Sequence, residues 1–230
     1  MMRPIFIEFY GLPGSGKSTL SHNLAGELRN RGFYVKEASY EIDKHGPFLR
    51  RIYKFLVCSY WLFFHHSCYA GAKDLVRENG YVGKEAFLHV INVIQIIGIY
   101  NRNTESDFIL LDQGLIQAAI SLSVNGKIAA YENFVRLVHL TEDVEPSKSI
   151  FVDVDVETSL QRMHKRSTNY SRVEKLRDDK KKLEMMASFV EGIQNYRSFR
   201  SAYGSDVQVD NSVVIDCVVE FLLDNIICHE

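Results

Sequence analysis

A glycine-rich loop near the start of the chain constrains its fold more than any other feature. Residues 11–19 read Gly-Leu-Pro-Gly-Ser-Gly-Lys-Ser-Thr and fit the pattern GxxxxGK followed by serine or threonine. The apolar run 5–10 before the loop predicts a buried strand. After the loop, the helical spacing of Leu20, Leu24 and Leu28 predicts a helix. Because glycines let the backbone point its N–H groups inward at a helix N-terminus, where they attract phosphate oxygens, these segments predict a phosphate-binding loop.

The residue types within this loop have separate expected roles. Lys17 is expected to reach the β- and γ-phosphates of a nucleotide, and the hydroxyl of Ser18 is expected to bind Mg²⁺. The alternative, a glycine turn that only joins a strand to a helix, leaves the adjacent lysine and serine unexplained. The residues assigned to cofactor binding in this segment are Gly11, Leu12, Pro13, Gly14, Ser15, Gly16, Lys17, Ser18 and Thr19.

The size and composition of the chain fit a single α/β domain over residues 1–230. A hydrophobic content of 46% and a charged content of 24% are ordinary for a soluble globular protein. The net charge of −2 argues against a nucleic acid polymer as partner. The four cysteines show no metal-binding spacing and are expected to be reduced thiols. With no export signal visible, a cytoplasmic location is expected.

Acidic residues follow two of the predicted strands. The strand predicted at 33–38 is followed by Glu41 and Asp43, which are candidates for contacting a substrate or are solvated loop acids. The fully apolar run 108–111 predicts a central parallel strand, and it ends in Asp112. At the carboxyl end of such a strand, the carboxylate of Asp112 can hold Mg²⁺ with its hydration shell or accept a proton from an attacking hydroxyl. A plain turn-forming aspartate is the alternative for Asp112.

A helical insertion is expected over about 47–101. Two or three helices are predicted there, with breaks near Gly71 and around 79–83. The dense aromatic residues favour helical core over a wall that stacks a planar substrate, although the sequence leaves both open. The apolar stretches 55–72 and 86–100 are interpreted as buried helices, which makes a membrane contact unexpected. The alternative is an exposed apolar patch for a partner, which includes a second copy of the chain in a homodimer, or for a membrane surface.

Basic residues cluster after a fourth predicted strand at 149–155. A helix is predicted to run through Leu160 to Arg166, and Arg162 and Arg166 stand four residues apart on one of its faces. The loop that leads to Arg172 suits a cover over phosphates, because the planar guanidinium stays charged and bonds phosphate oxygens in pairs. A solvated basic face is the alternative.

The remaining segments complete an alternation of helices and strands. Helices are predicted at 115–123, 130–140, 173–203 and 213–228, and a fifth strand is predicted at 207–210.

With the glycine loop, Asp112 and the pair of Arg162 and Arg166, the chain resembles the thymidylate kinase-like branch of the P-loop nucleoside and nucleotide kinases. The resemblance covers residues 6–20, 108–114, 151–166 and 207–222. It implies a three-layer P-loop NTPase fold whose five-stranded parallel sheet has the order 2-3-1-4-5. It also implies ATP with Mg²⁺, phosphoryl transfer to a small acceptor, and a lid over about 162–178 that contains both arginines.

The resemblance and the residues together assign a candidate role to each part of the site. The catalytic candidates are Lys17, Asp112, Arg162 and Arg166. The metal candidates are Ser18 and Asp112, and Arg162 joins the loop in binding the cofactor. The substrate-binding candidates are Glu41, Arg50 and Arg172.

Two departures from thymidylate kinases concern the acceptor. Those enzymes carry an acid where this chain has Pro13, and an Asp-Arg pair where it has Asp112 and Gln113. Both positions handle the acceptor phosphate in the family, so thymidine monophosphate is not the expected acceptor. The expected function is an ATP-dependent kinase for a nucleoside, nucleotide or similar metabolite. The alternatives are a P-loop switch or ATPase that acts through a protein partner, and a protein that binds ATP for structural purposes.

Overall fold

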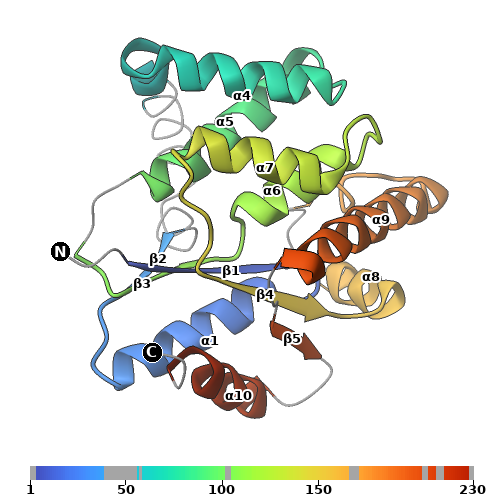
Figure 1. Ribbon diagram of the computed structural model, residues 1–230. Coiled ribbons are helices and arrows are strands. Elements are labelled where there is room, and N and C mark those ends of the chain that lie inside the picture. Colours follow the sequence, from blue (N-terminus) through green and yellow to red (C-terminus); the bar gives the residue numbers. More distant parts are fainter. Residues whose placement is uncertain are drawn as a thin grey trace.

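The computed structural model shows a parallel sheet between two helical layers (Figure 1). It describes residues 4–38, 56, 59–101, 105–165, 171–203, 207–210 and 215–227. The strands are β1 (Ile5–Gly11), β2 (Val35–Glu37), β3 (Phe108–Leu111), β4 (Lys148–Asp153) and β5 (Val207–Asp210). Their order is β2-β3-β1-β4-β5, and all neighbouring strands are parallel. The predicted α/β fold and strand order are confirmed.

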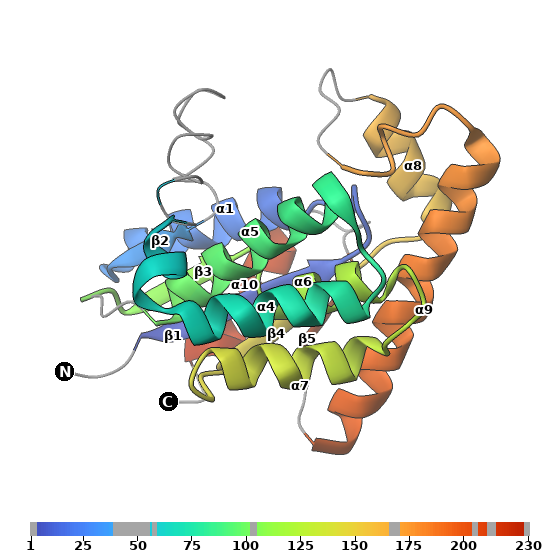
Figure 2. The ribbon, with the colours of Figure 1, turned by 90° about the horizontal axis from the view of Figure 1, so that it is seen from above.

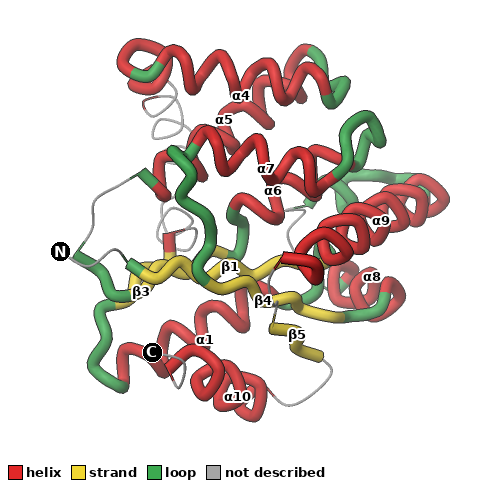
Figure 3. The backbone as a smooth tube through the Cα atoms, in the orientation of Figure 1, coloured by secondary structure: helices red, strands yellow, loops and turns green. Residues whose placement is uncertain are grey.

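Helices cover both faces of this sheet, as Figure 3 shows with strands in yellow between helices in red. One face is covered by α1 (Lys17–Asn30) and α10 (Ile215–Ile227). On the other side lie α5 (Gly83–Tyr100), α6 (Leu115–Ser123), α7 (Ala130–Leu140) and α9 (Asp179–Tyr203), and α4 (His66–Glu78) packs on α5 and α7. The short helix α8 (Val156–His164) follows β4 and lies with α9 to one side of the other helices (Figure 2).

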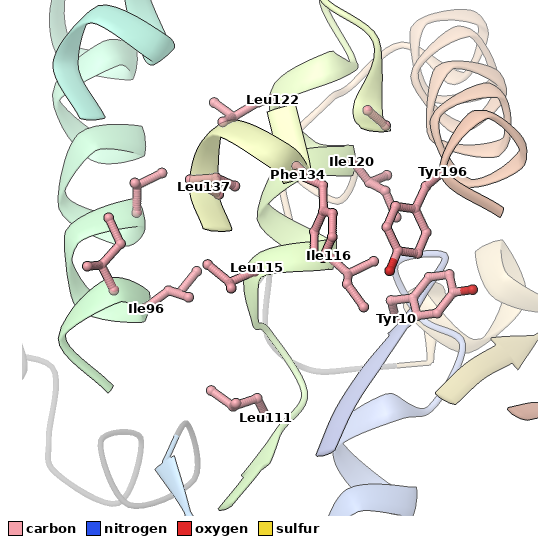
Figure 4. Packing of buried hydrophobic residues seen from close by; sticks show 14 of the residues in the cluster. Tyr10, Ile96, Leu111, Leu115, Ile116, Ile120, Leu122, Phe134, Leu137 and Tyr196 are labelled. Atoms are coloured by element: carbon pink, nitrogen blue, oxygen red, sulfur yellow. The ribbon is translucent and has the colours of Figure 1, made fainter. Parts of the chain in front are cut away.

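Strand β1 is buried on both faces, which explains its nearly continuous apolar sequence. Ile7 and Phe9 pack toward α1 and α10. Phe6 and Tyr10 point to the opposite face, where the ring of Tyr10 meets the ring of Tyr196 of α9 with their centroids 5.4 Å apart (Figure 4). The single polar side chain between them, that of Glu8, is therefore enclosed by the larger of the two core clusters.

Two helices, α4 and α5, lie within the described part of the predicted insertion, and one of the two predicted breaks is absent. The break around 79–83 is confirmed, because α4 ends at Glu78 and α5 begins at Gly83. The break near Gly71 is wrong, since α4 runs through this residue. A Cβ atom at Gly71 would lie 2.8 Å from Cδ2 of Leu140, so this glycine serves close packing of α4 on α7.

Aromatic residues of the insertion divide between core and surface. Trp61 is 6% exposed and belongs to the core, which agrees with the helical-core interpretation. Tyr60, Phe63 and Phe64 are 52%, 77% and 72% exposed, so that interpretation is wrong for them. Among the residues that the structure describes, no helix combines the length and the apolar character needed to cross a membrane.

The long helix predicted from 173 begins later, at Asp179. The reason is a local turn in which the backbone N–H of Ser171 donates to the Glu174 carboxylate and the backbone N–H of Glu174 donates to the Ser171 hydroxyl. This reciprocal pair is a capping box around a single turn, and the turn does not continue into α9. Asp178 then accepts a hydrogen bond from the backbone N–H of Lys180 at 2.9 Å, which is typical of a residue that caps a new helix.

Candidate functional site

The glycine loop lies between β1 and α1, as the sequence predicts. Gly14 and Gly16 have φ values of 86° and 95°, a region that L-residues with side chains rarely adopt. A Cβ atom at Gly14 would lie 2.7 Å from the carbonyl oxygen of Ser159, so the loop packs closely on α8. Over the described first turn of α1 there is no acidic residue, and its N-cap, Gly16, has no side chain. The positive end of the helix dipole is therefore available to an anion.

Lys17 lies at the centre of this loop. Its Nζ atom donates to the carbonyl oxygens of Gly11 at 3.0 Å and of Leu12 at 2.7 Å. Backbone carbonyl oxygens thus hold the ammonium group over the loop. Phosphate oxygens that enter the loop would find a full positive charge beside the backbone N–H groups.

Ser18 and Asp112, the two predicted metal ligands, are brought together. The Ser18 hydroxyl donates to Oδ2 of Asp112, which follows the end of β3. The other carboxylate oxygen, Oδ1, is buried, and among the described residues it has no hydrogen-bond partner. A buried charged oxygen without a partner is unfavourable, and a cation would satisfy it. One hydroxyl and one carboxylate suit Mg²⁺, which usually keeps waters and takes its other ligands from substrate phosphates.

The loop is braced by three side chains from other elements. Oε1 of Gln117 in α6 accepts a hydrogen bond from the backbone N–H of Gly11 at 3.1 Å. From α8, the Ser159 hydroxyl donates to the carbonyl oxygen of Pro13, and Arg162 donates to that of Ser15 at 3.2 Å. The predicted cofactor-binding Arg162 is therefore at the loop.

Neither Gln117 nor Ser159 was among the site residues predicted from the sequence. Gln117 is the one amide side chain in the apolar helix 115–123, and this contrast was a usable signal. Ser159 has no such signal, because serine is common in helices of mixed polarity such as α8.

Glu8 is a further residue that the sequence analysis did not single out. Its side chain is fully buried, and its carboxylate accepts hydrogen bonds from the Tyr100 hydroxyl at 2.5 Å and from two backbone N–H groups of α6. Burial raises the pKa of Glu8 to about 7, although these hydrogen bonds act in the opposite direction. The sequence feature that could have pointed to Glu8 is that it carries the one charge within the apolar run 5–10.

Glu37, the last residue of β2, is also an acid at a strand end, but its environment differs from that of Asp112. Its carboxylate is 2.7 Å from a guanidinium nitrogen of Arg29 and 2.7 Å from Nδ1 of His22, both in α1. These contacts tie β2 to α1. Glu37 is therefore engaged in holding two elements together, whereas Asp112 keeps one oxygen for a ligand.

Arg172, predicted to bind substrate, joins the segment after α8 to the insertion. Its NH2 atom donates to the carbonyl oxygen of Ser121 at 2.9 Å and to the hydroxyl of the same residue at 2.6 Å. Its NH1 atom lies 3.2 Å from the Tyr81 hydroxyl and 3.0 Å from Nε2 of His89. Burial, with the neighbouring guanidinium, lowers the pKa of His89 to about 4, so the imidazole is neutral and accepts this bond. Binding of a substrate by Arg172 stays a prediction.

Several predicted site residues lie outside the described part of the chain. These are Glu41, Asp43, Arg50 and Arg166. Of the predicted lid, the structure describes residues 162–165 and 171–178.

Comparisons with known proteins find similar solved structures but no match by sequence. No protein-family model matches the chain, and no curated protein matches it significantly. Deoxyadenosine kinase from M. mycoides, with dCMP and a flexible dCDP bound, is similar over 98% of this chain and 100% of its own, with 14% identity and a TM-score of 0.59. The same enzyme with dATP is similar over 96% and 98%, with 16% identity and a TM-score of 0.58.

A second kind of enzyme shows a similar fold. Shikimate kinase from Acinetobacter baumannii, in complex with shikimate, is similar over 99% of this chain and 95% of its own, with 14% identity and a TM-score of 0.52. At these identities the similarity establishes a shared fold. The chain therefore has the fold of P-loop kinases that act on small molecules.

Proposed function

We propose that this protein is an ATP-dependent phosphotransferase that transfers the γ-phosphoryl group of MgATP to a small acceptor. The observation that supports this most directly is the contact of the Ser18 hydroxyl with Asp112, whose Oδ1 is buried without a partner in the described structure. Ser18 follows Lys17 directly in the phosphate-binding loop, and Asp112 offers an unsatisfied oxygen beside it. A bound magnesium nucleotide needs this combination of a lysine for its phosphates and two oxygen ligands for its metal.

Different residues of the site would bind the phosphates and the metal ion. The loop N–H groups and Lys17 bind and orient the phosphates, and Ser18 and Asp112 hold the metal and its waters. Mg²⁺, when bound, neutralises charge on the β- and γ-phosphates. Arg162 is close enough to the loop to contact the phosphates, and we assign the same role to Arg166. Catalysis then depends on orientation and electrostatic stabilisation.

The acceptor is proposed to be a nucleoside, nucleotide or similar metabolite whose oxygen attacks the γ-phosphorus in line. Two structures of similar fold hold deoxynucleotides and one holds shikimate, which supports a small polar acceptor. None of these structures is named as a thymidylate kinase, and Pro13 and Gln113 depart from the pattern of that branch. Either Asp112 or Glu41 is the group that takes the proton from the attacking hydroxyl.

The test is ADP production by the purified protein with MgATP and a panel of nucleosides, nucleoside monophosphates and small alcohols. We expect release that depends on one acceptor class and is lost in Lys17→Ala, because this substitution removes the charge that orients the phosphates. The Lys17→Ala protein is the blank, since a contaminating kinase would give ADP in both samples. Acceptor-independent release in the wild type would contradict a kinase.

A second candidate function is a nucleotide-binding switch or ATPase that acts through a protein partner. It is favoured by two exposed aromatic residues, Phe63 and Phe64, and by Gln113, which is exposed next to Asp112 and could orient a water. The same assay separates the two functions. ATP binding with slow turnover that no acceptor accelerates would favour the switch.

A further inference from the structure

Glu8 occupies an unusual place for a charged side chain. It lies in the middle of β1, the central strand, and its exposed fraction is 0%. Its neighbours on the same face of the strand, Phe6 and Tyr10, belong to the hydrophobic core. A carboxylate in such surroundings costs free energy unless donors satisfy it, so its contacts indicate what it is there to hold.

Two of those contacts are with the start of α6. Oε1 of Glu8 accepts a hydrogen bond from the backbone N–H of Leu115 at 2.5 Å, and Oε2 accepts one from that of Ile116 at 2.9 Å. The N-cap of α6 is Gly114, which has no side chain to accept these bonds. Glu8 therefore performs the capping role from a different element, and its ionised form places a negative charge at the positive end of the helix.

The contact of Glu8 with α6 leaves no room for a side chain at Gly114. A Cβ atom there would lie 2.0 Å from Oε1 of Glu8, a distance at which two atoms overlap. The φ of Gly114 is −108°, which other residues also adopt, so backbone conformation alone does not require glycine. The requirement comes from the carboxylate, which approaches the backbone closely.

The turn that Glu8 holds carries two side chains of the candidate site. Asp112 lies three residues before Leu115, and Gln117 follows Ile116 directly. Asp112 contacts Ser18, and Gln117 accepts the hydrogen bond from the backbone N–H of Gly11. Glu8 and Gly11 are three residues apart on β1. Glu8 contacts the start of α6, and Gln117 of α6 contacts Gly11, so two contacts join β1 and α6 on either side of the first turn.

We infer that Glu8 is a positioning residue that fixes Asp112 and Gln117 for the binding of a magnesium nucleotide. It does so through the first turn of α6 and without touching the nucleotide. The inference rests on the proposed function, because it assumes that Asp112 holds the metal. Partners that orient a metal ligand typically change metal affinity by about 10- to 100-fold when they are replaced.

The test compares MgATP binding by calorimetry in the wild type, Glu8→Gln and Gly114→Ala. Glu8→Gln keeps the size of the side chain but replaces one acceptor oxygen by an NH₂ group that faces a backbone N–H. Gly114→Ala pushes on the same carboxylate from the other side. We expect each variant to bind MgATP about tenfold or more weakly, and the double variant to lose little beyond either single one, because both remove the same contact.

Hydrogen exchange gives a readout that does not depend on the nucleotide. The backbone N–H groups of Leu115 and Ile116 should exchange faster in both variants, and that of Gly11 should follow. The control is Val219→Ala, which removes buried methyl groups in α10 on the opposite face of the sheet. It should lower the melting temperature while leaving MgATP affinity within about twofold of the wild type, because Val219 belongs to the core cluster on the other face of the sheet from Leu115 and Ile116.

The outcomes separate this inference from the proposed function. If the wild type binds MgATP and Glu8→Gln binds it equally well, with a lower melting temperature only, the inference is overturned and the function stands. If Val219→Ala weakens binding as much as Glu8→Gln, general destabilisation explains both and the inference is again overturned. If the wild type does not bind MgATP, the proposed function fails and the inference falls with it. Should Glu8→Gln not fold, Gly114→Ala decides by the same criteria.

Discussion

Glu8 shows how one side chain can tie the stability of the fold to pH. Its pKa is raised from 4.5 to about 7, chiefly because burial disfavours the charged carboxylate. A raised pKa in the folded protein means that the folded state binds the proton more tightly than the unfolded state does. The stability from this group is thus fully present below about pH 4.5 and is lost as the pH rises through about 7.

The prediction is a pH-dependent difference between the wild type and Glu8→Gln. Between pH 4.5 and pH 8, the free energy of unfolding of the wild type should fall relative to that of the variant by about 3 kcal/mol, since one pKa unit corresponds to about 1.36 kcal/mol. Urea unfolding at several pH values measures both curves, and the variant corrects for every other titrating group. Two parallel curves would show that Glu8 does not titrate in this range.

Single residues also mark the limit of what the sequence predicts about the site. Lys17, Ser18 and Asp112 could be predicted because a motif and a strand end fix their positions relative to the chain. Gln117 and Glu8 act through contacts between segments more than 100 residues apart. No local pattern specifies such a contact, although a lone polar residue in an apolar element signals that one exists.

At the scale of elements, α8 follows β4 and contacts the phosphate-binding loop with the side chains of one helical face. Ser159 and Arg162 stand three residues apart, and both donate to carbonyl oxygens of the loop. Helical periodicity places such residues on one side of a helix. The predicted lid therefore begins from a helix whose position relative to the phosphate site is already fixed.

We predict that Arg162→Ala lowers kcat by about 10³-fold or more, because an arginine that stabilises charge in phosphoryl transfer contributes on that scale. The matched control is Lys181→Ala, which removes a charged side chain that is exposed on α9. Steady-state kinetics with the acceptor found in the ADP assay would measure both. Equal losses in the two variants would contradict the assignment of Arg162.

The elements themselves were mostly predictable, and the exceptions have physical causes. The apolar run at 108–111 became a strand because a sheet covered on both faces selects continuous apolar sequence. Residues 207–210 instead alternate apolar and polar side chains, which fits an edge strand with one exposed face. Gly71 was interpreted as a break, but tertiary packing against Leu140 keeps it inside α4. The start of α9 was missed because residues 171–174 form a separate capped turn, and Asp178 caps the helix that begins after it.

At the scale of the whole molecule, the phosphate-binding loop is where the layers meet. It follows the central strand β1, leads into α1 on one face, and is braced by Gln117 of α6 and Ser159 of α8 on the other. A ligand that binds this loop in the folded state alone must stabilise the whole fold. Its effect on unfolding should then be seen in every element and not only at the site.

The last prediction is that MgATP raises the melting temperature of the wild type. At a concentration about 100 times its Kd, a ligand adds about 2.7 kcal/mol of stability, which for a chain of 230 residues corresponds to roughly 5–10 °C. ATP with a chelator should give a smaller shift, because Oδ1 of Asp112 then gains no metal. Lys17→Ala should also give a smaller shift, since the phosphates lose their lysine. Calorimetric scans measure all three, and equal shifts in the wild type and Lys17→Ala would place ATP away from this loop.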